Sequence, residues 1–218
     1  MPDNPWFSWS YVTSSWDELS TLLWQHALIT VEAVLIAFVV SVPLAALAAR
    51  VRWLAGPILA GTSALYTIPS LALFAILAPV LGIGRTSVLV GLVLYALVIL
   101  VRNTLAGLQS VDPAVLDAAR GLGFGRFRRF WSVELPGALP GILAGLRLAT
   151  VSTVALVTVG VVVGYGGLGT LILRGFQSFY RAEIMTATLL CLLLALVLDV
   201  VIWAVGRALT PWRRGAGA

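Results

Sequence analysis

The sequence lacks lysine entirely, and among its 218 residues it has one cysteine, Cys191, and one histidine, His26. Without lysine, the chain cannot use a P-loop lysine, a Schiff base or a lysine general base. A single cysteine excludes an intrachain disulfide, and this pair is too few for a Cys/His zinc cluster. Charge is also scarce, at 11% of residues, where soluble domains carry about 25%.

Hydrophobic residues are correspondingly abundant. They make up 60% of the chain, and the mean hydropathy is +1.02. Soluble domains are typically about 45–50% apolar, so this composition favours a polytopic membrane protein. The net charge of +5 does not indicate nucleic-acid binding, because no arginine-rich soluble domain carries it.

Five uncharged or nearly uncharged stretches reach the roughly 20 residues that a membrane-crossing helix needs. The predicted spans are 20–50, 54–80, 86–110, 138–163 and 184–208. We expect a kinked helix in the second, because three prolines interrupt it. Pro136 and Pro140 are expected to break the path before the fourth span. The prediction is an all-α integral membrane protein with one transmembrane domain over residues 1–218.

The placement of arginine predicts the orientation, since cytoplasmic segments are enriched in basic residues. If the N-terminus is outside, eleven arginines fall in cytoplasmic segments and three in external ones. The cytoplasmic set is Arg50, Arg52, Arg102, Arg120, Arg126, Arg128, Arg129, Arg147, Arg207, Arg213 and Arg214, and the external set is Arg85, Arg174 and Arg181. We therefore expect an external N-terminus and a cytoplasmic C-terminus. We expect no secretory signal peptide, because the N-terminus has no basic region.

A polar segment at residues 112–136 separates the third and fourth spans. Asp112 followed by Pro113 predicts a helix start, with an N-cap acceptor and then proline in the first turn. We expect a short helix up to Gly121, and Gly123 permits a sharp turn after it. On pattern alone, the segment is also compatible with a surface loop that carries a membrane-hugging amphipathic helix.

The same segment resembles the EAA motif of ABC importer permeases. That motif is E-A-A, three residues, G, nine residues and then I-x-L-P. Here Asp117, Ala118 and Ala119 stand for E-A-A, Gly123 follows at the motif's spacing, and Val133 to Pro136 complete it. Aspartate for glutamate and valine for isoleucine are the departures. The resemblance implies coupling helices between spans 3 and 4 that dock on a separate ATPase, through Asp117, Ala118, Ala119, Gly121, Gly123, Leu135 and Pro136.

Further stretches resemble the osmoprotectant branch of these permeases, which imports glycine betaine, choline, carnitine and proline betaine. They are residues 66–74, 81–84, 101–104, 110–113 and 164–169. The resemblance implies a five-span type I importer core in the bacterial cytoplasmic membrane. It implies a non-catalytic subunit without metal or cofactor, because ATP and Mg²⁺ bind to the partner.

The partners that the resemblance implies are two ATPase subunits, a second permease chain and an extracytoplasmic substrate-binding protein, within the lipid bilayer. The second permease chain is either an identical copy or a paralogue. We expect no nucleic-acid partner.

Candidate pathway residues come from the spans themselves. Broken spans often line substrate paths, and charged residues within spans are costly, so both point to function. The candidates for the pathway or gates are Tyr66, Thr67, Pro69, Ser70, Asn103, Thr104 and Glu32. Tyr66 and Tyr95 can offer aromatic faces to a quaternary ammonium group. Asp199 is the less favoured charged candidate, since hydration near the cytoplasmic boundary explains it as well.

Alternatives remain open at this stage. The glycines at 164, 166 and 169 match G-x-G-x-x-G, but no βαβ unit surrounds them, so a re-entrant turn at the outer gate is the better interpretation. The cargo can also be an amino acid or a thiol-imidazole betaine. A stand-alone secondary carrier or channel is a different class of function, and transport that survives ATP depletion would favour it.

Overall fold

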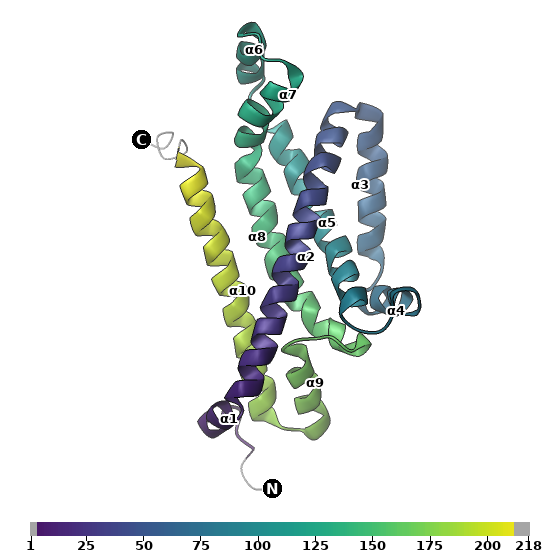
Figure 1. The fold of residues 1–218 in the computed structure, drawn as a ribbon, viewed down its shortest axis with the longest axis vertical. Helices are drawn as coiled ribbons and strands as arrows, with labels where there is room; N and C mark the ends of the chain where they lie inside the picture. The colour runs from purple at the N-terminus through teal and green to yellow at the C-terminus, as the bar shows by residue number, and fades with distance from the viewer. Residues whose placement is uncertain (1–3, 212–218) are drawn as a thin grey trace.

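A computed structural model of the chain describes residues 4–211, and every regular element in that range is a helix (Figure 1). The long helices are α2 (Trp16–Arg50), α5 (Arg85–Gln109), α8 (Leu135–Val159) and α10 (Arg181–Leu209). The shorter helices are α1 (Trp9–Ser14), α3 (Arg52–Thr67), α4 (Ser70–Leu81), α6 (Pro113–Gly121), α7 (Arg126–Arg129) and α9 (Gly169–Ser178). The side chain of Arg52, and the expected cytoplasmic Arg213 and Arg214, lie outside the described part.

Within residues 4–211, four helical stretches are long and apolar enough to cross a membrane. They are Trp16–Arg50, Arg85–Gln109, Arg126–Val163 and Arg181–Leu209. The helices α3 and α4 pass the same test only as a pair, which gives five candidate spans when the pair is counted as one. These findings confirm the all-helical membrane class that the composition predicts.

The second predicted span differs from the kinked helix expected at 54–80. The chain turns by 97° between α3 and α4, so the two helices are nearly perpendicular. The break falls before Pro69, where Ile68 is extended at φ −72° and ψ 124°. A proline disfavours the helical conformation in the residue before it, which ends α3 at Thr67. Pro57 and Pro79 lie inside helices and break neither.

The expected break at Pro136 and Pro140 is wrong, because one continuous helical stretch runs from Arg126 to Val163. A π-helical turn, Phe130–Glu134, absorbs the irregularity before Pro136. Pro136 lies in the first turn of α8, where the N–H that proline lacks has no partner within α8 itself. Pro140 lies further inside α8.

The centre of the molecule is the contact of α2, α5 and α8. One cluster of fully buried side chains joins Ala33 of α2, Leu92 of α5 and Val157 of α8. Small residues let the backbones approach closely, as is common between membrane helices. A methyl group on Gly141 of α8 would lie 2.8 Å from Cα of Gly107 in α5. These two helices therefore meet backbone to backbone.

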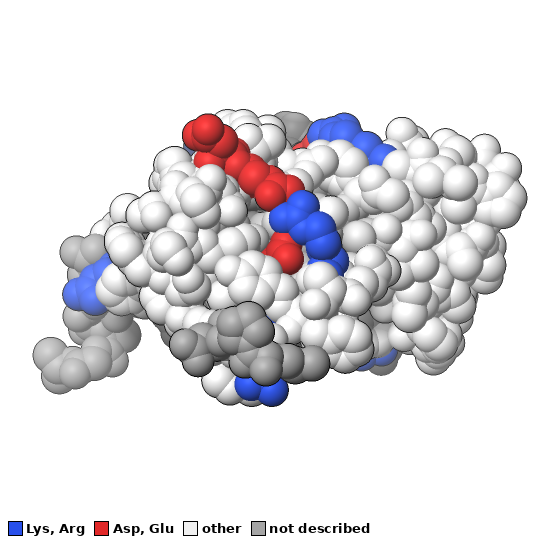
Figure 2. Space-filling view, turned by 90° about the horizontal axis from the view of Figure 1, so that it is seen from below, with Lys and Arg blue, Asp and Glu red and all other residues white. Residues whose placement is uncertain are grey.

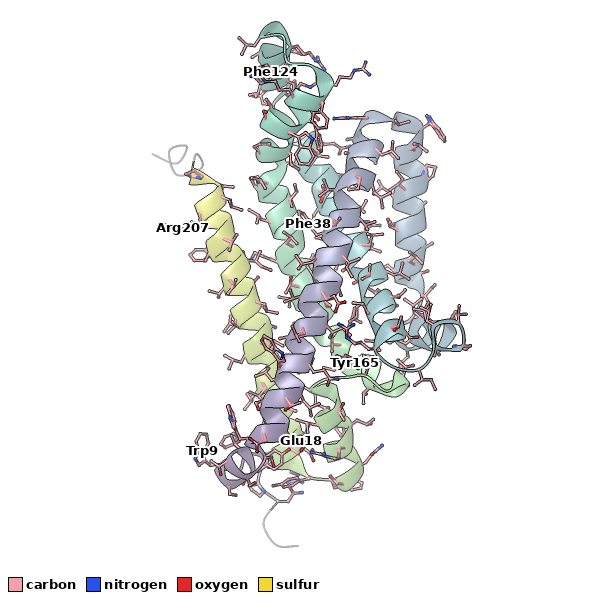
Figure 3. The ribbon with its side chains drawn as sticks, viewed as in Figure 1. Trp9, Glu18, Phe38, Phe124, Tyr165 and Arg207 are labelled. Atoms are coloured by element: carbon pink, nitrogen blue, oxygen red, sulfur yellow. The ribbon has the colours of Figure 1, made fainter. Side chains whose placement is uncertain are left out.

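The two ends of the molecule differ in what they carry. Figure 1 shows α6, α7 and the C-terminal end of α10 at one end, with α1, α4 and α9 towards the other. Phe124 and Arg207 lie towards the first end, and Trp9 and Glu18 at the second (Figure 3). We call the first the α6 end and the second the α9 end. The helix α9 was not expected, because the glycine run before it indicates only irregular structure.

Candidate coupling surface and transport pathway

The short helix α6 begins as its sequence predicts. The carboxylate of Asp112 accepts a hydrogen bond from the backbone N–H of Ala114 at 2.8 Å, and Pro113 occupies the first helical position. Ala119 faces inward and is 5% exposed, whereas Ala118 and Asp117 lie on the exposed surface. The side chain of Asp117 pairs with Arg120 one turn later, at 2.7 Å.

The turn after α6 depends on Gly123. This residue has φ +78°, a left-handed conformation that strongly favours glycine. Its N–H donates to the Arg120 carbonyl at 2.9 Å, and the Phe124 N–H donates to the Ala119 carbonyl at 3.0 Å. This pair of bonds is the Schellman arrangement, which satisfies the last carbonyls of a helix. Gly123 thus fixes the angle at which the chain leaves α6.

Side-chain contacts hold the return path from α7 to α8. Arg129 and Glu134 form an ion pair of 2.7 Å across the π-helical turn, and both side chains are largely buried. The Arg128 guanidinium lies 4.2 Å from the ring centre of Phe124. Leu135 and Pro136, the end of the motif, are half-buried at the start of α8. The motif therefore forms one braced unit rather than a loose loop.

Large apolar side chains are exposed on this unit. Leu122 is 76% exposed and Phe127 is 77% exposed, and Val115 lies on the surface of α6. They belong to α6, α7 and the turn between them, the segment in which Figure 3 labels Phe124 at the tip of the α6 end. An exposed apolar cluster with charged neighbours is typical of a protein–protein contact. Gly121 is exposed beside them, and a methyl group there would meet nothing within 4 Å.

The candidate pathway residues of the second span gather at the break between α3 and α4. The rings of Tyr66 and Tyr95 meet edge to face with centroids 5.7 Å apart. The hydroxyl of Tyr95 donates to the carbonyl of Ile68, which the break leaves outside the helix. Tyr66 is 54% exposed, Thr67 and Pro69 are exposed, and Ser70 is half-buried. The break thus presents an aromatic and polar surface outward.

Asn103 and Thr104 lie elsewhere, at the crossing of α5 and α8. The Asn103 amide donates to the carbonyl of Ile99 at 2.8 Å, and its side chain packs against Gly145. Thr104 is fully buried. In this conformation both side chains belong to helix packing rather than to the aromatic surface at the α3–α4 break.

Glu32 has a partner within the chain. Its carboxylate pairs with Arg85, the first residue of α5, and both side chains are partly exposed. The structure therefore supplies an intrachain counter-ion for Glu32. Asp199 is also paired, since its two oxygens accept from Nε and Nη2 of Arg147 at 2.7 and 2.6 Å. The sequence suggested that water near the cytoplasmic boundary hydrates Asp199. In the structure its direct counter-ion is Arg147.

The α9 end holds an ion-pair cluster that the sequence does not reveal. Arg174 of α9 contacts both oxygens of Glu18 in α2, at 2.7 and 2.9 Å, and Glu183 in α10 at 2.6 Å. Figure 2 shows acidic and basic side chains side by side on this face. The hydrogen bonds to Glu18 raise the pKa of Arg174 above its usual range. Burial, and then the nearby charge of Glu183, raise the pKa of Tyr11 to about 12.

Within residues 4–211, no group of three or more His, Cys, Asp or Glu side chains is arranged to hold a metal ion. His26 is instead a structural contact. Its Nδ1 accepts from the backbone N–H of Leu168 at 3.3 Å, so Nε2 carries the proton and donates to the Val154 carbonyl at 2.9 Å. The sequence carries no signal for this role, because the burial of His26 and its two partners arises only in the folded chain.

Comparison with known families identifies the chain. The family model described as "Binding-protein-dependent transport system inner membrane component" matches residues 41–215. The chain belongs to this family. It is therefore a non-catalytic, multi-pass permease subunit of an ABC importer in the inner membrane, within a system that depends on a binding protein.

Several permeases are similar over most of their length. The glycine betaine/carnitine/choline transport system permease protein OpuCD of Bacillus subtilis is 38% identical over 89% of this chain and 85% of its own. The osmoprotectant import permease protein OsmW of Salmonella typhimurium is 36% identical over 92% of this chain and 96% of its own. The choline transport system permease protein OpuBD of Bacillus subtilis is 37% identical over 87% of this chain and 84% of its own.

Solved structures give the same fold. An inward-facing structure of the MetNI methionine ABC transporter aligns with a TM-score of 0.83 at 22% identity, over 90% of this chain and 98% of that one. The structure of an amino acid ABC transporter aligns with a TM-score of 0.75 at 17% identity, over 92% of this chain and 98% of that one. At such identity the likeness establishes only the fold.

Proposed function

We propose that the chain forms the transmembrane pathway of an ATP-driven importer for small osmoprotectants such as glycine betaine, choline, carnitine or proline betaine. The observation that carries the proposal is the extent of the similarity: two curated osmoprotectant permeases align over 89% and 92% of this chain. The aromatic pair Tyr66–Tyr95 at the α3–α4 break suits a quaternary ammonium cargo, which cation–π contacts attract.

Coupling to ATP hydrolysis is assigned to α6 and α7. The exposed Asp117 and Ala118, and the inward Ala119, lie on α6, which ends at Gly121, and Gly123 sets the turn after it. Two ATPase subunits would dock here, each bearing the ATP and Mg²⁺. Leu135 and Pro136 pass a displacement of α6 directly into α8.

The packing of α5 against α8 supports a route by which such a displacement would reach the pathway. The coupling segment joins the end of α5 to the start of α8, and these helices meet backbone to backbone at Gly107 and Gly141. A push on α6 would therefore move α5 and α8 together as a rigid pair. Since 25 residues of helix span about 38 Å, α8 carries the motion to the glycine turn at the α9 end. That turn, with Glu32 and Arg85 nearby in α2 and α5, is assigned to the outer gate.

We propose an external N-terminus. Arg126, Arg128 and Arg129 lie in α7, at the α6 end, whereas Arg174 lies in α9, at the α9 end (Figure 1). Under the positive-inside rule, this difference supports a cytoplasmic α6 end. A binding protein would deliver cargo at the α9 end. A second permease chain, identical or paralogous, would complete the pathway. Asn103 and Thr104 would act through the α5–α8 crossing during inner-gate movement.

Uptake by the purified complex in proteoliposomes tests the function. With ATP and the binding protein supplied on their respective sides, labelled glycine betaine should accumulate, and excess choline or carnitine should compete. Competition only by an amino acid or a thiol-imidazole betaine would move the cargo to that class. Accumulation without ATP would replace the importer with a carrier or channel.

A further inference from the structure

Arg102 is a charged residue without a carboxylate partner among the described residues. It lies within Arg85–Gln109, one of the stretches that can cross a membrane. Glu32 and Asp199 each pair with an arginine, whereas no ion pair between described residues involves Arg102. A charge without a counter-ion inside a candidate span is costly, so it points to a function.

The guanidinium of Arg102 is held against α3. Its Nη2 donates to the hydroxyl oxygen of Ser63 at 2.6 Å, and that hydroxyl donates in turn to the carbonyl of Leu59. A guanidinium carries several N–H donors in one plane. Within residues 4–211 it has no other hydrogen-bond partner, so its remaining N–H groups are available to an anion.

A cavity of about 350 Å³ lies beside this guanidinium, between α3 and α5. Its volume is within the range of pockets that bind small molecules. Arg102 is the charged residue of its lining, and the other lining residues are Leu59 of α3 and Leu105, Ala106 and Gln109 of α5. A wall with one positive charge among apolar side chains suits a small solute that has a carboxylate and an apolar part.

The aromatic pair Tyr66–Tyr95 lies along the same contact of α3 with α5. Tyr66 follows Ser63 by three residues, about one turn of α3, and Tyr95 precedes Arg102 by seven residues, about two turns of α5. Residues at these spacings share one face of a helix. A solute that moves along this face from the α3–α4 break towards the α6 end would therefore meet the aromatic rings first and Arg102 second.

We propose that Arg102 binds the carboxylate of the cargo, and that it thereby favours glycine betaine and carnitine over choline. The inference rests on the proposed function, from which it takes the class of cargo. All three compounds share a trimethylammonium group, which the rings of Tyr66 and Tyr95 attract. Choline lacks the carboxylate, which accepts hydrogen bonds from the guanidinium. Arginine suits this role because its planar fork matches a carboxylate in geometry as well as in charge.

Ligand binding to the complex without its binding protein tests the role of Arg102. The permease, purified with its copurifying subunits, is reconstituted in nanodiscs. Glycine betaine and choline are titrated separately, and saturation-transfer NMR follows their N-methyl protons. We expect glycine betaine to bind more tightly. In Arg102→Gln this preference should fall about tenfold, on the order of one hydrogen bond between a guanidinium and a carboxylate. Choline binding should stay unchanged, which shows that the variant is folded.

Further variants separate this role from general effects. Arg50→Gln removes the same charge from a guanidinium that lies 5.0 Å from the ring centre of Phe130, outside the cavity, and should keep the preference. Arg102→Lys keeps the positive charge and should retain part of the preference. Tyr66→Ala should weaken the binding of both ligands equally, whereas Tyr66→Phe keeps the ring and should bind both as before.

Equal affinity of the unmodified complex for the two ligands would overturn the proposal, as would an unchanged preference in Arg102→Gln. Equal loss of both ligands in Arg102→Gln would show that Arg102 acts only in helix packing, and would also overturn it. ATP-dependent uptake decides the proposed function separately. If the unmodified complex accumulates glycine betaine but Arg102→Gln keeps the preference, only this inference fails. If the unmodified complex accumulates no glycine betaine, both fail.

Discussion

Leu168 donates its backbone N–H to Nδ1 of His26 over 3.3 Å, a bond between positions 142 residues apart. The same imidazole donates from Nε2 to Val154 of α8, so one buried side chain joins α2, α8 and the glycine turn. The turn packs directly on α2, because a methyl group on Gly167 would lie 3.0 Å from Cα of His26. The proposed outer gate is therefore fastened to α2 at one point.

Replacing His26 should weaken the attachment of the glycine turn to α2. In His26→Ala the buried N–H of Leu168 loses its partner, and an unsatisfied buried group costs about 1–3 kcal/mol. We expect a lower unfolding midpoint in detergent and faster hydrogen exchange at the Leu168 amide. Gln25→Ala, on the adjacent half-buried residue, is the control and should change neither. Unchanged exchange at Leu168 in His26→Ala would show that the bond does not hold the turn.

The turn at Gly123 offers a test of coupling. A methyl group there meets nothing within 4 Å, so Gly123→Val acts only through the left-handed backbone, at a cost of roughly 1–2 kcal/mol. We expect the variant to insert normally while ATP-dependent uptake is abolished. Gly125 also has open space but an extended backbone at φ −62°, so Gly125→Val is a matched control that should retain uptake. Normal uptake by Gly123→Val would remove the coupling assignment.

The pair Arg147–Asp199 should matter more than an exposed pair. Asp199→Asn leaves Arg147 without its counter-ion inside a candidate span, where an unpaired charge is costly. We expect a clear loss of stability in detergent, and partial recovery in the double variant Arg147→Leu with Asp199→Leu. The control is Asp117→Asn, whose highly exposed pair with Arg120 should contribute at most about 1 kcal/mol. Equal losses in the two single variants would contradict this ranking.

The crossing of α5 and α8 should not tolerate added volume. The new methyl group in Gly141→Ala would lie 2.8 Å from Cα of Gly107, and backbone cannot yield as a side chain can. We expect a loss of about 1–3 kcal/mol, the usual cost of overpacking, in thermal unfolding. Gly61→Ala in α3, where nothing lies within 4 Å, should leave the midpoint unchanged or raise it. The close approach is refuted if both variants unfold at the same temperature.

Local signals in the sequence predict local structure well. The N-cap Asp112, Pro113 and the glycine at 123 mark the beginning and end of α6, and the structure confirms both. Capping and turn formation depend on residues a few positions apart, so a sequence pattern contains the information. The composition likewise predicts the membrane class, because the hydrocarbon core imposes span length and hydropathy.

Contacts between helices are not predicted in the same way. Asp199 pairs with Arg147, 52 positions earlier in the sequence, and His26 bonds to Leu168. The rotation and crossing of the helices bring these residues together. No local pattern encodes that rotation. The chain passes Pro136 without a break because the π-helical turn before it absorbs the irregularity, whereas the break at Ile68 turns by 97°. A proline alone does not specify which of these outcomes occurs.

A photo-crosslinking residue at Ala118 tests the central claim most directly. Ala118 is exposed on α6, and Phe179, 81% exposed in the turn between α9 and α10, is the control position at the opposite end. After irradiation of native membranes, mass spectrometry identifies the captured chains. The account predicts a P-loop ATPase captured from Ala118 and not from Phe179. Capture of the ATPase from Phe179 alone, or from neither position, would contradict it.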